Sequence, residues 1–186
     1  MKKTKLRVFL ALALFLALPV LGALAQDLSE YTVKAAYLLN FVKFVDWPDK
    51  VYADDDGAVV IGILGDDPFG DALDEMVSGK VIEKHPVVIR RFDSFNGAQS
   101  AQLRRCHVLF ISYSEKDRLS GILQAVRGAP VLTVSEIERF TAKGGMILFD
   151  QEGDRITLAI NKRAAEKSGL ILSSQLLQVA RIYKGE

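Results

Sequence analysis

Short apolar segments that alternate with helix-like segments restrict the fold of this chain more than any other sequence feature. The first, Ala58–Leu64, is apolar throughout, and strand-like segments follow at Pro86–Phe92, His107–Ser112 and Val131–Val134. Continuous apolar strands are typical of parallel sheets that helices cover on both faces. The alternation therefore predicts an α/β fold with a mostly parallel sheet and helices on both faces.

A polar turn near the C-terminus predicts a hairpin. Gly145–Asp150 and Arg155–Ile160 flank the turn, and both are strand-like. We find neither an internal repeat nor a linker, and 49% of the residues are hydrophobic. The sequence thus predicts a single domain whose sheet ends in an antiparallel C-terminal hairpin.

Residues with short polar side chains mark where helices are expected to begin, because such side chains accept a hydrogen bond from a first-turn amide. In chain order the predicted caps are Asp67 (followed by Pro68), Ser114, Ser135 (in a capping box with Glu138), Asn161, and Ser173 or Ser174. The helices that follow Asp67, Ser114 and Asn161 are expected to end near Gly79, Gly128 and Gly169, and the last helix near Tyr183.

The N-terminus has the pattern of a cleavable secretion signal. Residues 2–7 are mostly basic, residues 8–18 are apolar, and Ala23-Leu24-Ala25 is a small-x-small cleavage pattern. The apolar stretch is too short to span a bilayer. We therefore expect a signal peptide at residues 1–25 and an exported domain at residues 26–186.

Residues 28–46 form the most unusual predicted helix. Leu28 and Val33 are placed as a hydrophobic staple around a Ser29 cap, and Trp47-Pro48 is expected to end the helix. Its apolar arc is far wider than the roughly 100° that one core contact needs. One apolar face comprises Tyr31, Ala35, Leu38, Val42 and Val45, and the second comprises Val33, Tyr37, Phe41 and Phe44. We predict that this second face, together with Trp47, contacts a partner or a second copy; packing within the domain is the alternative.

The sequence contains no catalytic or metal-binding motif. His85 and His107 are the only histidines, and Cys106 is the only cysteine. We expect His107 and Cys106 to be buried structural residues, with no catalytic residue, metal or cofactor. Outside the signal there is no basic cluster that would indicate nucleic-acid or membrane-surface binding.

The loop at residues 62–70 follows the first strand, where a phosphate loop would lie. Its sequence matches neither a dinucleotide fingerprint nor a P-loop, and Asp66 and Asp67 would repel a phosphate. A capped turn is the favoured interpretation. Asp66, Asp67 and Phe69 remain a candidate ligand loop, because doubly wound sheets bind ligands at the carboxyl ends of their strands.

The sequence resembles the YfiR-like periplasmic regulators. The carrying residues are Lys34–Pro48 (KAAYLLNFVKFVDWP), Gly62–Gly70, Cys106–Ser112, Gly144–Ile147 with Phe149 and Ile160-Asn161, and Ser173–Leu177. The resemblance covers nearly all of the chain after the signal, and the helix that ends in Trp-Pro is its most specific part.

The resemblance implies a periplasmic regulatory domain without enzymatic activity. Such proteins bind the periplasmic sensor domain of an inner-membrane diguanylate cyclase, or a comparable kinase, and hold it inactive; some form dimers. Disulfides tune this repression in some members, but one cysteine excludes an internal disulfide here. Two other function classes stay open: a periplasmic small-molecule sensor, and a hydrolase that would use His85 or His107.

Overall fold

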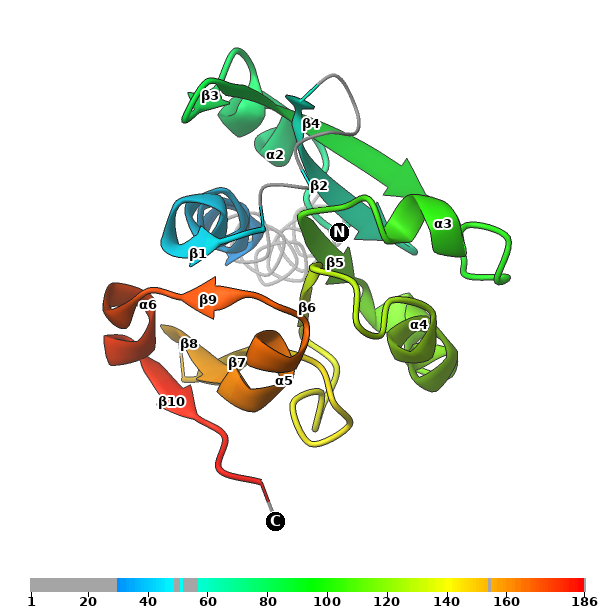
Figure 1. The fold of residues 1–186 in the computed structure, drawn as a ribbon, viewed down its shortest axis with the longest axis vertical. Coiled ribbons are helices and arrows are strands. Elements are labelled where there is room, and N and C mark those ends of the chain that lie inside the picture. Colours follow the sequence, from blue (N-terminus) through cyan, green and yellow to red (C-terminus); the bar gives the residue numbers. More distant parts are fainter. Residues whose placement is uncertain (1–29, 49–50, 52–56, 154, 186) are drawn as a thin grey trace, which may run out of the picture.

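The computed structural model describes residues 30–48, 51, 57–153 and 155–185. An eight-stranded sheet lies at its centre, with the strand order β10-β8-β7-β6-β5-β2-β4-β3 (Figure 1). The strands are β2 (Val59–Leu64), β3 (Val81–Ile82), β4 (His85–Phe92), β5 (Val108–Ile111), β6 (Leu132–Ser135), β7 (Ile147–Glu152), β8 (Arg155–Ile160) and β10 (Ala180–Ile182).

Most neighbouring strands run parallel, as the sequence predicts. The pairs β4–β2, β2–β5, β5–β6, β6–β7 and β8–β10 are parallel, whereas β7–β8 and β3–β4 are antiparallel. The C-terminal hairpin is present, with Ile147 opposite Ile160 and Glu152 opposite Arg155. It does not form the edge of the sheet, because β10 adds a further parallel strand beside β8.

Helices cover both faces of the sheet, and two clusters of buried side chains fill the spaces between. The first helix, described over residues 30–44, packs on one face together with α2 (Asp71–Val77), α5 (Lys162–Lys167) and α6 (Ser174–Gln178). Helices α3 (Ser100–Leu103) and α4 (Leu119–Ala125) pack on the other face. Side chains of β2 alternate between the clusters, with Ile61 in one and Val60 in the other. This alternation explains why the strand is apolar throughout.

A small second sheet connects the first helix to the C-terminal part of the chain. The helix gives way at Val45 to β1 (Val45–Asp46), which pairs antiparallel with β9 (Ile171–Leu172). The helix therefore ends before Trp47-Pro48, slightly earlier than predicted. The predicted signal peptide, the staple residue Leu28 and the cap Ser29 lie outside the described residues.

Two predicted helix starts are wrong. Helix α2 begins at Asp71, because Asp67 accepts the amide of Phe69 at 2.8 Å in a local turn and Gly70 adopts a positive φ of 51°. Helix α4 begins at Leu119, and Ser114 lies in a short 3₁₀ helix, η3 (Tyr113–Glu115). The Ser114 hydroxyl accepts a hydrogen bond from the amide of Asp66, on a different loop, so it does not cap a helix.

Two further helices differ from expectation. The segment after Ser135 forms turns, because Ser135 is still part of β6 and Arg139 has a positive φ of 61°. The last helix, α6, stops at Gln178, and the chain continues as β10. The predicted caps at Asn161 and Ser173 are confirmed, since each side chain accepts the amide three residues ahead.

Candidate functional site

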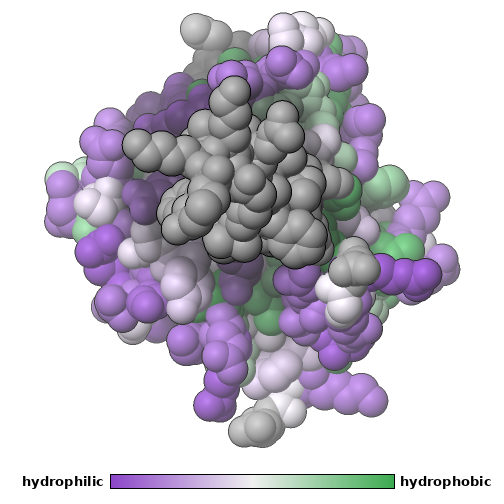
Figure 2. All heavy atoms as spheres, turned by 180° about the vertical axis from the view of Figure 1, so that it is seen from behind, coloured by the Kyte–Doolittle hydropathy of each residue, from purple (hydrophilic) through white to green (hydrophobic). Residues whose placement is uncertain are grey.

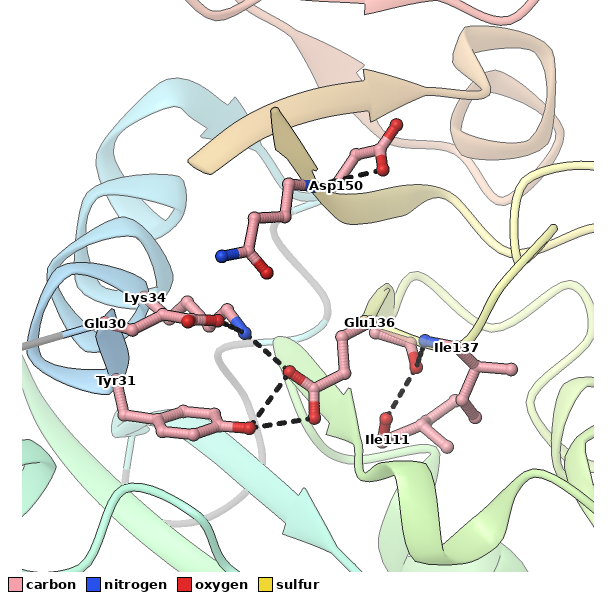
Figure 3. A network of polar contacts seen from close by, with 9 residues as sticks. Glu30, Tyr31, Lys34, Ile111, Glu136, Ile137 and Asp150 are labelled. Atoms are coloured by element: carbon pink, nitrogen blue, oxygen red, sulfur yellow. Dashed lines mark hydrogen bonds and ion pairs between the residues drawn. The ribbon is translucent and has the colours of Figure 1, made fainter. Parts of the chain in front are cut away.

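A polar pocket lies where strands β5, β6 and β7 end, close to the start of the first helix. Its volume is about 480 Å³, and its lining includes Glu30, Lys34, Tyr113, Glu136 and Asp150. The first helix contributes Glu30 and Lys34, and the segment after β6 contributes Glu136 (Figure 3). Carboxyl ends of parallel strands are where doubly wound sheets commonly hold ligands.

Lys34 is the centre of the hydrogen-bond network in this pocket. Its ammonium lies 2.5 Å from Glu30 and 2.6 Å from Glu136, although the residue is only 5% exposed. The Tyr31 hydroxyl donates to the same Glu136 carboxylate at 3.1 Å, and Figure 3 shows these side chains pointing toward one another. Two carboxylates therefore neutralise one buried ammonium, as a buried charge requires.

This network has the chemistry of a structural pin. Lys34 is engaged by carboxylates on both sides, and the pocket is lined by neither cysteine nor histidine. The pin holds the first helix to the sheet at a point where the neighbouring core contacts are apolar. The sequence offered one signal for it, because Lys34 falls between the buried residues Leu38 and Phe41 around the helix.

A second set of side chains closes the crevice between β2 and β5, where the order of the parallel strands reverses. Gly65, with a φ of +90°, lets the chain pass against η3; a Cβ there would lie 2.5 Å from the Ser114 hydroxyl and 2.9 Å from Glu115. The Ser114 hydroxyl also binds the Asp66 amide at 2.9 Å. Side chains of η3 therefore fill this crevice.

The candidate ligand loop is built from residues with structural contacts. Phe69 is 4% exposed, and its ring meets Phe110 edge-on with 4.8 Å between centroids. Asp67 pairs with Arg91 at 2.7 Å, and Asp74 pairs with the same guanidinium. These two carboxylates raise the pKa of Arg91 above its ordinary value, with the Asp74 hydrogen bond as the main cause. In this structure the loop ties α2 to β4.

Glu115 is the most deeply buried carboxylate at this end of the sheet. Arg118 donates to it at 2.7 and 2.8 Å, and the amide of Phe95 donates at 3.2 Å. The Arg118 hydrogen bonds are the main cause that lowers the pKa of Glu115, while burial acts in the opposite direction. Glu115 therefore remains ionised at neutral pH and connects η3, α4 and the segment after β4.

The predicted interface residues divide between core and surface. Phe41 and Trp47 are buried in the domain, at 1% and 7% exposure. The Phe41 ring stacks on Tyr37 and Phe149, and the Trp47 ring lies 5.7 Å from His107. These two side chains therefore pack within the domain, which is the alternative that the sequence left open.

The other predicted interface residues reach the surface. Val33 is 44% exposed, while Tyr37 and Phe44 are half-buried. With the exposed Asn40 they follow the spacing i, i+4, i+7, i+11, which places them on one stripe of the helix. We call Val33, Tyr37, Asn40 and Phe44 the outer stripe. On the face in Figure 2, the described surface is mostly hydrophilic, with smaller hydrophobic areas.

The histidines and the cysteine have structural surroundings. His107 is 1% exposed, and its Nδ1 accepts the amide of Val60 at 3.1 Å. His85 contacts the carbonyl of Gly57 from the start of β4. Cys106 is buried, and a Cβ on Gly62 would lie 2.6 Å from its sulfur. The predicted burial of His107 and Cys106 is confirmed.

Within residues 30–48, 51, 57–153 and 155–185, no group of three or more histidine, cysteine, aspartate or glutamate side chains is arranged to hold a metal ion. The helices of this part of the chain also lack the length and apolar character needed to cross a membrane.

The family model described as YfiR/HmsC-like matches residues 31–181, from the first helix to β10. This chain belongs to the YfiR/HmsC-like family. The match begins at Tyr31, so it includes Lys34 and the whole Lys34–Pro48 segment on which the resemblance rests. The family is one of periplasmic regulators of diguanylate cyclases, and it is regulatory rather than catalytic.

A solved structure described as a conserved domain protein from Vibrio cholerae is similar at 15% identity with a TM-score of 0.46. The similarity covers 68% of this chain and 54% of that one, so this chain spans about half the length of that solved structure. A comparison with curated proteins finds no matching relative.

Proposed function

We propose that this protein is a periplasmic adaptor that binds the sensor domain of an inner-membrane signalling protein, such as a diguanylate cyclase, and holds it inactive. The observation that carries the proposal is the match of a YfiR/HmsC-like regulator family to residues 31–181. Export through a cleaved signal at residues 1–25 is part of the same proposal.

The outer stripe of the first helix is the proposed docking surface. It offers one exposed and two half-buried apolar side chains, at Val33, Tyr37 and Phe44, and the amide of Asn40. The helix beneath it is held by Lys34 and by the buried Phe41, so the stripe is presented on a rigid element. Such an i, i+4, i+7, i+11 surface suits an amphipathic helix of the partner.

A charge on the outer stripe tests this proposal. Val33→Asp places a carboxylate in the proposed contact while leaving the buried residues unchanged. We expect it to weaken binding to the purified sensor domain at least about tenfold, or ~1.4 kcal/mol, and to raise cyclic-di-GMP in cells that contain the cyclase.

The matched control is Val81→Asp, at a valine that is 62% exposed on β3. Both variants should keep the circular dichroism and thermal midpoint of the unmodified protein. Equal binding by the two variants would place the interface elsewhere. If the outer stripe instead pairs two copies of this chain, sedimentation should show that the Val33→Asp protein becomes monomeric, while its affinity for the sensor domain stays unchanged.

A small-molecule sensor remains the second candidate function. The observation in its favour is a large basic pocket at the opposite end of the sheet from Lys34. A ligand regulates such an adaptor only if it binds the free and partner-bound forms with different affinity.

A further inference from the structure

A large pocket lies at the end of the sheet opposite the Lys34 network. It encloses about 640 Å³, in the range of small-molecule sites. Its wall comes from the end of α4, the start of β6, the turn before β7, helix α5 and the segment after β10. Figure 1 shows α4, α5 and the C-terminal segment gathered around this end of the molecule.

Positive charge dominates this pocket. Five of its lining residues are basic: Arg127, Lys143, Arg163, Lys167 and Lys184. Among the described lining residues there is no aspartate or glutamate. By contrast, the lining of the pocket at Lys34 contains more carboxylates than cations.

The five cations also lack carboxylate partners. In the part of the chain that the structure describes, none of them forms an ion pair, whereas Arg91, Arg118 and Arg181 each pair with a carboxylate. Five like charges around one cavity repel one another, and a bound anion would relieve that repulsion. The five cations are spread along the sequence from residue 127 to residue 184, so they are close together only because of the fold.

An apolar wall lies beside the charges. Val126 and Met146 are buried at 5% and 6% exposure, and Leu123 and Ala164 are half-buried. Thr133 and Asn161 are engaged by the protein itself, because the Thr133 hydroxyl accepts the Met146 amide and Asn161 caps α5. The polar groups of the pocket that could bind a ligand are therefore mostly the basic side chains, and they lie next to an apolar surface.

We propose that this pocket binds an organic phosphate, with the phosphate held by the cations and an apolar or aromatic part against Val126 and Met146. A phosphate monoester carries close to two charges at neutral pH and accepts hydrogen bonds on three oxygens, so it matches several cations better than a monocarboxylate does. The same group occurs on soluble phosphate esters and on phosphatidic acid. The inference does not depend on the partner proposed above.

Calorimetric titration with phenyl phosphate tests the inference. We expect saturable binding that is tighter than for inorganic phosphate, absent for phenol, and weakened by added salt, because exposed cations are screened. Lys143→Gln/Arg163→Gln should raise the dissociation constant about tenfold or more. Lys167→Gln/Lys184→Gln, which removes the second cation of α5 and the cation after β10, should have a comparable effect.

The matched control is Lys43→Gln/Lys80→Gln, which removes the same charge at exposed lysines outside the pocket. Equal affinity of the pocket and control variants would overturn the inference, as would an absence of binding to phenyl phosphate. Flotation with phosphatidylcholine vesicles, with and without phosphatidic acid, distinguishes a lipid phosphate from a soluble phosphate ester. Flotation that requires phosphatidic acid and Arg163 indicates the lipid, whereas phenyl phosphate binding without flotation indicates a soluble ester.

Discussion

Glu115 illustrates how a single carboxylate can join three segments of this fold. It has no exposed surface, and it accepts hydrogen bonds from Arg118 and from the amide of Phe95. Gly65 passes so close to it that any side chain at that position would collide. The crevice between β2 and β5 is therefore filled by an ion pair whose strength depends on pH.

Acid should weaken this ion pair. The pKa of Glu115 is below its ordinary value of 4.5 in the folded protein, so its stabilising contribution is complete above pH 4.5 and is lost as pH falls through the folded-state pKa. Glu115→Gln should lower the free energy of unfolding by about 2 kcal/mol at pH 7, with a smaller difference at acid pH. Urea titrations at several pH values measure it. The exposed Glu75→Gln is the control, and a pH-independent loss in Glu115→Gln would contradict the role of ionisation.

The same scale shows why some sequence predictions fail. Ser135 and Glu138 have capping-box spacing, yet the Ser135 hydroxyl donates to the carbonyl of Ile111 and accepts the amide of Ile137. The hydrogen bond from Ser135 to Ile111 forms because β5 lies beside β6, and the local sequence around Ser135 does not reveal this pairing. Asn161 and Ser173 follow their local pattern, and their caps are confirmed.

At the scale of elements, the first helix is held by a polar pin as well as by its apolar faces. Its buried residues follow the helical periodicity that the sequence displays, which is why its position and its end near Trp47 could be predicted approximately. The pin could not be predicted, because Lys34 and Glu136 are separated by 102 residues. The basic pocket could not be predicted for the same reason, since its five cations come from four separate segments of the chain.

A double-mutant cycle measures the pin. Lys34→Met and Glu136→Gln should each destabilise the fold, and their coupling energy should be about 1–3 kcal/mol, because hydrogen bonds between charged groups are strong when water is largely excluded. The matched control is Lys162 with Glu166, an exposed pair 3.4 Å apart, for which about 0.5 kcal/mol or less is expected. Equal coupling in the two pairs would show that Lys34 is a solvated charge and not a pin.

At the scale of the whole molecule, the two ends of the sheet differ in charge. The pocket at the carboxyl ends is rich in carboxylates and is crossed by the Lys34 network, whereas the pocket at the other end is lined by five cations. Strand β1 follows the first helix and pairs with β9, which follows α5 in the chain. Helix α5 in turn forms one wall of the basic pocket. The proposed docking surface and the proposed phosphate site are thus separate but belong to one continuous structure.

Trp47 allows a test of whether that structure unfolds as one unit. It is the only tryptophan, it follows β1, and it is buried against His107, the residue directly before β5. Its fluorescence therefore reports the junction of the first helix with the sheet, while far-ultraviolet circular dichroism reports all helices and strands. Because one buried cluster includes residues of the first helix, β2, β5, β7 and α6, both signals should change at the same urea concentration. Lys34→Met should move both midpoints down together. A fluorescence transition at lower urea than the dichroism transition would mean that the first helix detaches from a sheet that stays folded, which would contradict its proposed role as a rigid docking element.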